Sequence, residues 1–136
     1  MRILSIDFGE KRIGLAVSDP LGYTAQGLPT LKRQNKEQVL RDIAGTCREW
    51  EVREILIGLP VNMDGTTGPK AKEVLNFVPL LEKACSLPVK TWDERLSSRQ
   101  AGRLMIEEGL SRQKQRMQSD QLAAILILQS YLESKR

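Results

Sequence analysis

Histidine is absent from this 136-residue chain. Without imidazole, Ser-His-Asp and Cys-His nucleophile systems are excluded, together with zinc sites that depend on histidine. The only cysteines, Cys47 and Cys85, are too far apart in sequence for a redox motif or a zinc knuckle. We expect both to be small core thiols in a reducing compartment. Any acid–base or metal chemistry must therefore depend on carboxylates, with lysine, arginine or water in support.

Aromatic residues and long apolar runs are also scarce. The chain has two each of Phe, Trp and Tyr, so a base-stacking platform of the kind that single-strand binders use is poorly supported. The longest apolar run, Leu122–Leu128, is far too short to span a membrane. The amino terminus reaches Asp7 too soon for the apolar region of a signal peptide. The sequence therefore predicts a cytoplasmic protein with no membrane partner.

Length and composition predict one globular domain over residues 1–136. Hydrophobic residues make up 40% of the chain and charged residues 28%, which is enough apolar material for one core. The formal net charge of +4 is concentrated, because the segment from Arg95 to Gln118 carries six basic and two acidic residues. A basic stripe of this kind suits a polyanion such as a nucleic acid, and it equally suits a solvated helix face.

Apolar runs and turn residues predict an α/β protein. The first two strands are separated by a short turn at Gly9, which is typical of a hairpin, and the third is interrupted by Gly27 and Pro29, as an edge strand can be. The order of elements indicates a mixed sheet flanked by helices. Strands are expected at 2–8, 12–18, 23–31, 54–58 and 87–92, and helices at 36–50, 69–84, 97–108 and 112–134.

Carboxylates stand where two of these strands end. Asp7 ends the first strand, and Asp93 and Glu94 end the last one, so the three meet at one sheet edge if the strands are parallel and close. Asp120 begins the apolar face of the final helix and should point toward the sheet. Such a cluster repels itself unless cations hold it, and oxygen ligands alone select Mg²⁺ or Mn²⁺. Two such ions, roughly 4 Å apart, can activate a water and stabilise the leaving oxygen of a phosphodiester.

Each of these residues also has a purely structural explanation. Asp7 could simply close a turn, although an acidic side chain directly after a buried strand is energetically unfavourable without a partner. Asp93 and Glu94 fit acids at a helix start, where the macrodipole favours them. Asp120 fits a helix cap, and Arg12 fits a surface ion pair. These residues indicate the metal site of an enzyme that acts on nucleic acid only when they are considered together.

Four blocks of sequence resemble the YqgF family, bacterial RNase H-like proteins described as Holliday junction resolvases or as pre-16S ribosomal RNA nucleases. They are DFGEKRIGLAVSD at 7–19, GLP with DG within 58–65, DERLSS at 93–98, and SDQLAA with ILQ within 119–129. The blocks follow the family order and span nearly the whole chain. Ser119 departs from the pattern, because many relatives carry an apolar residue there. The resemblance implies an RNase H-like fold, a five-stranded mixed sheet whose first three strands are antiparallel, with helices on both faces.

The resemblance also implies a divalent-metal-dependent endonuclease that acts on structured nucleic acid and trims the 16S rRNA precursor during ribosome maturation. Asp7 would bridge two Mg²⁺ or Mn²⁺ ions, and Glu94 and Asp120 would each complete one of them. Asp93 would support these ligands without binding an ion itself. Cleavage by such a site leaves 5′-phosphate and 3′-hydroxyl ends.

Four arginines are the candidate nucleic-acid contacts. Arg12 and Arg95 match positions of the family motifs and would contact the scissile phosphate or its neighbour. Arg99 and Arg103 are four residues apart, so they share one face of the helix expected there. With Arg95 before them, they would follow a phosphate backbone, and binding would weaken steeply with salt.

Three other functions remain open. The protein could be a Holliday junction resolvase in DNA recombination and repair, or an RNA-binding ribosome-assembly factor that cuts nothing. Sugar kinases and actin-like ATPases share the opening strand–Asp-x-Gly–hairpin, but they need two lobes around a cleft.

No exposed apolar stripe indicates a dimer interface, so monomer and homodimer both remain open, and RNA processing is favoured over symmetric junction cleavage.

Overall fold

The computed structural model describes residues 1–96 and 112–135, with only the backbone of 112–118. No helix in these ranges combines the length and apolar character needed to cross a lipid bilayer. The elements, in chain order, are β1 (Arg2–Phe8), β2 (Arg12–Ser18), β3 (Ala25–Lys32), α1 (Lys36–Glu49), β4 (Val52–Leu59), α2 (Pro69–Cys85), β5 (Val89–Asp93), the 3₁₀ turn η1 (Glu94–Leu96) and α4 (Arg112–Ser134).

The five strands form one sheet in the order β3-β2-β1-β4-β5. β2 is antiparallel to both β1 and β3, whereas β4 is parallel to both β1 and β5. The predicted RNase H-like architecture, with three antiparallel strands first, is therefore confirmed. The predicted bounds of the described elements differ from the observed ones by no more than two residues. The helix predicted at 97–108 lies outside the described residues.

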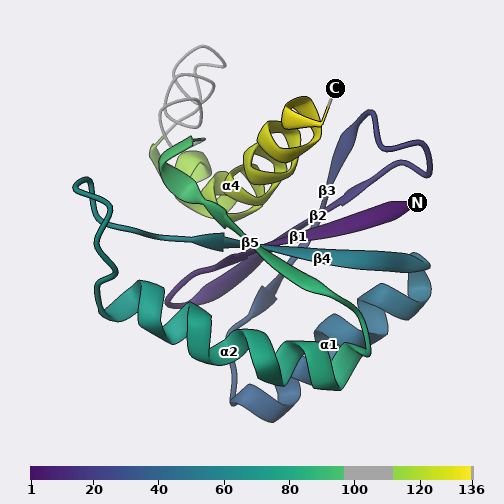
Figure 1. Cartoon of the computed structure of the whole chain (residues 1–136), viewed down its shortest axis with the longest axis horizontal. Coiled ribbons are helices and arrows are strands. Elements are labelled where there is room, and N and C mark those ends of the chain that lie inside the picture. The colour runs from purple at the N-terminus through teal and green to yellow at the C-terminus, as the bar shows by residue number, and fades with distance from the viewer. Residues whose placement is uncertain (97–111, 136) are drawn as a thin grey trace.

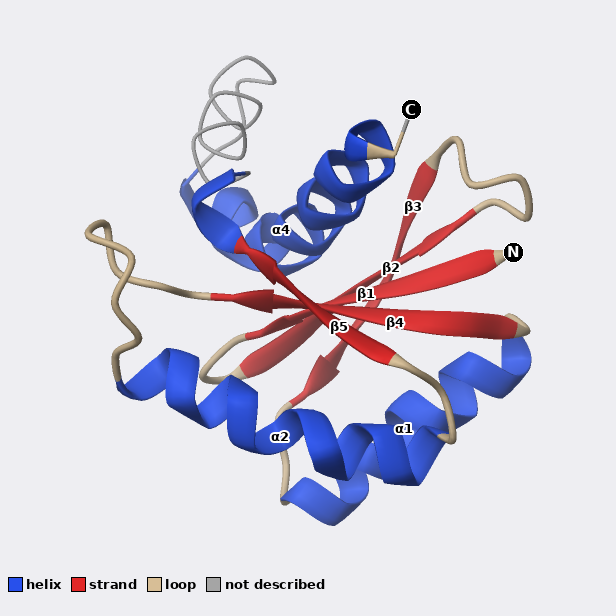
Figure 2. Cartoon of the chain, in the orientation of Figure 1, coloured by secondary structure: helices blue, strands red, loops and turns tan. Residues whose placement is uncertain are grey.

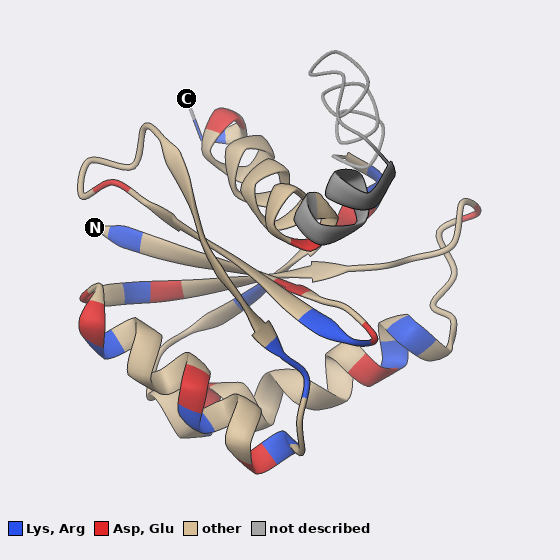
Figure 3. Ribbon diagram, turned by 180° about the vertical axis from the view of Figure 1, so that it is seen from behind, with Lys and Arg blue, Asp and Glu red and all other residues tan. Residues whose placement is uncertain are grey.

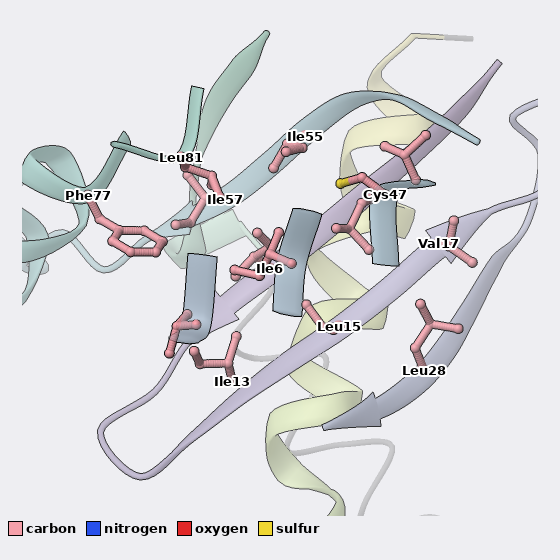
Figure 4. Packing of buried hydrophobic residues seen from close by; sticks show 14 of the residues in the cluster. Ile6, Ile13, Leu15, Val17, Leu28, Cys47, Ile55, Ile57, Phe77 and Leu81 are labelled. Carbon is pink, nitrogen blue, oxygen red and sulfur yellow. The ribbon is translucent and has the colours of Figure 1, made fainter. Parts of the chain in front are cut away.

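Helices cover both faces of the sheet, α1 and α2 on one side and α4 on the other (Figures 1 and 2). Successive side chains of a strand point to opposite faces, so the central strands contribute to two cores. In β1, Leu4 and Ile6 pack with α1 and α2, and Ile3 packs with α4. Figure 4 shows Ile6 among the side chains of the first core. This double coverage explains the nearly continuous apolar sequences of β1 and β4.

Polar contacts hold α4 against its face of the sheet. The Ser5 hydroxyl in β1 donates a hydrogen bond to the carbonyl of Ala124 at 2.7 Å. The Tyr131 hydroxyl donates to the buried carboxylate of Glu54 at 3.0 Å, and Lys90 Nζ lies 3.1 Å from the same oxygen. Because a buried carboxylate is costly without partners, these contacts favour one position of the helix on the sheet. The position of α4 in turn determines where Asp120, at the start of the buried face of this helix, lies relative to the sheet.

Candidate functional site

Two carboxylates come together at the carboxyl ends of the parallel strands. Asp7 lies near the end of β1, and Glu94 is the first residue after β5. β4 separates their strands, and its Gly58 leaves the space through which the Glu94 side chain passes. A Cβ atom on residue 58 would lie 2.6 Å from Glu94 Oε1 and 2.6 Å from Ile127 Cδ1. A glycine is therefore needed there for Glu94 to reach toward Asp7.

Asp120 reaches the same place from α4. Gly14 of β2 is the register partner of Asp7, and a Cβ atom on Gly14 would overlap the carbonyl group of Asp120. A Cβ on Gly9 would lie 3.3 Å from Asp120 Oδ1. The helix backbone thus packs directly on the strand pair that carries Asp7. The structure therefore brings together three of the acids that the sequence singled out, Asp7, Glu94 and Asp120.

The pKa of Asp7 is strongly affected by its position in the cluster. Burial raises the pKa of Asp7 to about 8, and a hydrogen bond with Glu94 and the negative charges of Glu94 and Asp120 act in the same direction. At neutral pH and without a cation, Asp7 is therefore mostly protonated, and its hydroxyl donates the hydrogen bond to Glu94. Like charges held this close cannot all ionise unless a positive charge balances them.

Arg12 is a basic residue that contacts this cluster. Its Nε atom lies 3.4 Å from Asp120 Oδ2, across the start of β2 and the start of the buried face of α4. Both side chains are partly open to solvent, so the ion pair is weak and can be exchanged for another partner. Arg12 therefore lies at the partly exposed edge of the acidic cluster.

Asp93 and Arg95 bind each other. Arg95 donates to Asp93 through Nε at 2.9 Å and Nη2 at 2.7 Å, and this guanidinium lowers the pKa of Asp93. Arg95 Nη1 also donates to the carbonyl of Met63 at 3.2 Å, in the β4–α2 loop. The pair thus links the end of β5 to that loop, and the sequence did not predict this contact. Arg99 and Arg103, the other candidate phosphate contacts, lie outside the described residues.

Two further cations border the site and were missed in the sequence. Arg33 Nη1 donates to the carbonyl of Gly9 at 2.9 Å, and Lys70 Nζ lies 2.9 Å from Glu10 Oε1. Both line a pocket of about 150 Å³ that Asp7 also lines. Their sequence positions were a usable signal, because each adjoins an element end at this same sheet edge. Other residues lining the pocket are Phe8, Gly9, Glu10, Pro60, Glu73 and Glu94.

The cluster fits a hard divalent cation by its donor chemistry. In the parts of the chain that the structure describes, no three acidic, cysteine or histidine side chains are arranged as a ready metal site. As they lie, Asp120 is paired with Arg12 and Asp7 is hydrogen-bonded to Glu94. All three donors are nevertheless carboxylates, the ligand type that Mg²⁺ and Mn²⁺ prefer. Burial is the main cause of the raised pKa of Asp7, and the negative charges of Glu94 and Asp120 add to it, so a cation there would favour the ionised carboxylates.

Comparison with known proteins gives a family match over nearly the whole chain. The model of the family described as "RuvX: Holliday junction resolvase" matches residues 1–134. A protein of Syntrophomonas wolfei named "Putative pre-16S rRNA nuclease" is 48% identical over 133 residues, covering 98% of this chain and 94% of that protein. A Clostridium acetobutylicum protein of the same name is 47% identical over 134 residues, covering 98% and 99%.

The fold is also similar to a solved resolvase structure. "T. thermophilus RuvC in complex with Holliday junction substrate" superposes with a TM-score of 0.59 and 17% sequence identity, covering 98% of this chain and 96% of that one. At this level of identity the likeness concerns the fold alone. It agrees with the mixed sheet and the helices on both faces described above.

Proposed function

Because this chain belongs to the RuvX family, described as Holliday junction resolvases, we propose that it is a divalent-metal-dependent endonuclease that hydrolyses phosphodiester bonds in structured nucleic acid. The observation that carries the proposal is the meeting of Asp7, Glu94 and Asp120 at one sheet edge, from three separate elements. A protein that only bound nucleic acid would gain nothing from a cluster of negative charge, which repels phosphate. The acidic cluster therefore favours an enzyme over a ribosome-assembly factor without activity.

Asp7, Glu94 and Asp120 are the residues that would hold Mg²⁺ or Mn²⁺, two ions in the arrangement we propose. When bound, such cations supply Lewis acidity, which favours deprotonation of water and offsets charge on a phosphodiester during hydrolysis. Asp7 would have to lose its proton to act as a ligand. Without that proton it would no longer donate a hydrogen bond to Glu94, so both carboxylates would be free to hold the ions.

We assign different roles to the cationic side chains around the cluster. Arg12 exchanges its weak contact with Asp120 for the scissile or a neighbouring phosphate. Arg33 and Lys70 line the pocket that Asp7 and Glu94 also line, and Lys70 interacts with the negative charge of Glu94. Arg95 remains bound to Asp93 and to the β4–α2 loop, so we assign it and Asp93 the task of positioning the segment that carries Glu94.

We propose the 16S rRNA precursor as the substrate, which implies that the protein acts in the cytoplasm. The names of the Syntrophomonas and Clostridium relatives support RNA. The family description supports a second candidate, cleavage of four-way DNA junctions. That activity would require two symmetric cuts and hence a homodimer, whereas a monomer suffices for trimming RNA.

The test is cleavage of end-labelled precursor 16S rRNA and of a four-way DNA junction, each with Mg²⁺, Mn²⁺ or EDTA. We expect the wild type to cut with a divalent ion and Asp7→Asn to cut neither substrate while remaining folded. Glu82→Gln on the exposed face of α2 removes one carboxylate far from the cluster and should cut normally. Binding of the RNA without cleavage under any ion would overturn the proposal and favour the binding factor.

A further inference from the structure

A basic groove lies beside the acidic cluster, between the start of β2 and the end of β3. It has a volume of about 520 Å³ and is lined by Lys11, Arg12, Thr30 and Lys32. Three of these four residues are cationic and none is acidic. Arg12 also contacts Asp120, so one residue that lines the groove belongs to the edge of the acidic site.

Like charges face each other in this groove. Arg12 and Lys32 are register partners in the antiparallel β2–β3 pair, so their side chains project from the same face of the sheet. Like charges directly opposite each other destabilise a sheet. Figure 3 shows the two basic segments side by side, at the start of β2 and the end of β3.

Among the groove's cations, Arg12 forms an ion pair with a described residue, and Lys11 interacts at longer range with the charge of Glu10. Neither Lys11 nor Lys32 forms an ion pair with any residue that the structure describes. By contrast, Arg33 and Lys70, on the other side of the β1–β2 turn, each have a glutamate partner. Lys11 and Lys32 therefore lack the close carboxylate partner that Arg33 and Lys70 have, and their charge is available to an anion from outside the chain.

We infer that this groove binds the sugar–phosphate backbone of the nucleic-acid strand that runs into the acidic site. Lys11 and Lys32 contact its phosphates by charge, and the Thr30 hydroxyl is placed to donate a hydrogen bond to a phosphate oxygen. The inference rests on the proposed function, because it extends the same substrate beyond the bond that is cut. Phosphate contacts fix the register of a strand and carry no sequence information, so the groove determines affinity and direction.

The experiment measures binding without cleavage. Wild type and the double variant Lys11→Gln/Lys32→Gln are titrated in EDTA against fluorescent precursor 16S rRNA fragments, a four-way DNA junction and an unstructured single strand, at several salt concentrations. Removing two phosphate contacts should lower the slope of log affinity against log salt by about 1.4 to 1.8. The substrate most affected identifies which nucleic acid uses the groove. The double variant should melt no lower than the wild type, since it loses a like-charge pair.

The matched control is Arg53→Gln/Lys83→Gln. It removes the same net charge from two exposed residues. Arg53 lies near the start of β4, at the end of the strand away from the acidic cluster, and Lys83 lies in the last turn of α2. The control should keep the salt slope of the wild type. If both double variants lose the same slope, net charge alone explains binding and the groove proposal is wrong. An unchanged slope in Lys11→Gln/Lys32→Gln overturns it as well.

Cleavage assays separate this proposal from the proposed function. If the wild type cuts, the groove variant should show a higher KM and an unchanged kcat, because neither lysine touches the acidic cluster. If the wild type never cuts but the salt slope falls only in the groove variant, the groove stands and the nuclease assignment fails. If the wild type cuts and the groove variant matches it in KM and salt slope, the nuclease stands and the groove fails.

Discussion

Gly14 in β2 lies directly opposite Asp7 in β1, and the backbone of α4 passes against the hydrogen atoms that replace its side chain. Any Cβ atom at position 14 would overlap the carbonyl group of Asp120. The distance between the carboxylates of β1 and α4 thus depends on a residue that carries no chemistry. A position that looks like a conformational glycine in the sequence determines the geometry of the acidic cluster.

We expect Gly14→Ala to move α4 away from β2 and to separate Asp120 from Asp7. Overpacking of this kind costs about 1–3 kcal/mol of unfolding free energy, and here the obstructing atoms are backbone that cannot rotate aside. Urea unfolding measures that loss, and the cleavage assay should show activity falling further than stability alone explains.

Gly45→Ala is the control for this prediction. A Cβ atom there would meet only Arg48 Nη2, at 3.9 Å, within the α1 helix. Replacing a helical glycine by alanine should raise stability by about 0.5–1 kcal/mol. Equal unfolding midpoints for Gly14→Ala and the wild type would show that α4 does not depend on glycine at that position.

The pKa of Asp7 predicts an unusual pH dependence of stability for the metal-free protein. A carboxyl group with a pKa of about 8 in the folded state and near 3.8 when unfolded binds more protons in the folded state between those values. Stability should therefore fall as the pH rises from about 4 to about 8. Asp7→Asn removes this dependence, so in EDTA the variant should be the more stable protein near pH 8.

Chemical unfolding of both proteins across this pH range checks the sign. Added Mg²⁺ should stabilise the wild type near pH 8 more than it stabilises Asp7→Asn, because binding replaces the proton that Asp7 otherwise retains. Parallel pH profiles for the two proteins would mean that Asp7 is not the group that titrates.

Arg95→Ala should release the β4–α2 loop from the end of β5. The guanidinium is the group that joins Asp93 to the Met63 carbonyl, and lysine lacks the fork that makes both contacts. Because Arg95 is exposed, the free energy of unfolding should change little. Hydrogen exchange at residues 61–68 should become faster, and Arg95→Lys should not restore the wild-type rate.

Cleavage adds a second readout for this pair. If Arg95 positions Glu94 as we propose, kcat should fall more than KM rises. A change confined to KM, with loop exchange as in the wild type, would instead make Arg95 a phosphate contact. The exposed Arg41→Ala in α1 serves as the control and should alter neither quantity.

Tyr131→Phe tests how α4 is held. The change removes the hydrogen bond to the buried Glu54, and among the described residues Lys90 remains as a partner of that carboxylate. Hydrogen bonds to charged groups contribute about 1.5–3 kcal/mol, so a loss of that size in unfolding free energy is expected. Combining the change with Glu54→Gln should cost less than the sum of the two single changes, because both act on one contact. Strict additivity would contradict a direct interaction.

The order of elements was predictable because local signals produce it. Continuous apolar runs mark β1 and β4, a change to helical spacing marks α1, and the 112–134 bounds of α4 were predicted without error. Asp7 and Glu94 were predicted to meet for a similar reason. Parallel strands end at the same sheet edge, so residues at those ends are neighbours whatever their separation in sequence.

Side-chain direction and helix placement are not local properties, so the tertiary structure determines them. Asp93 and Glu94 are adjacent in sequence, yet Asp93 binds Arg95 whereas Glu94 is hydrogen-bonded to Asp7. Lys32 faces Arg12 only because β3 pairs with β2 in one register. Sequence thus determined the elements and the sheet edge where the acids collect, since periodicity and strand direction suffice for both. Which charges touch depends on packing between distant segments, and only the folded chain specifies that.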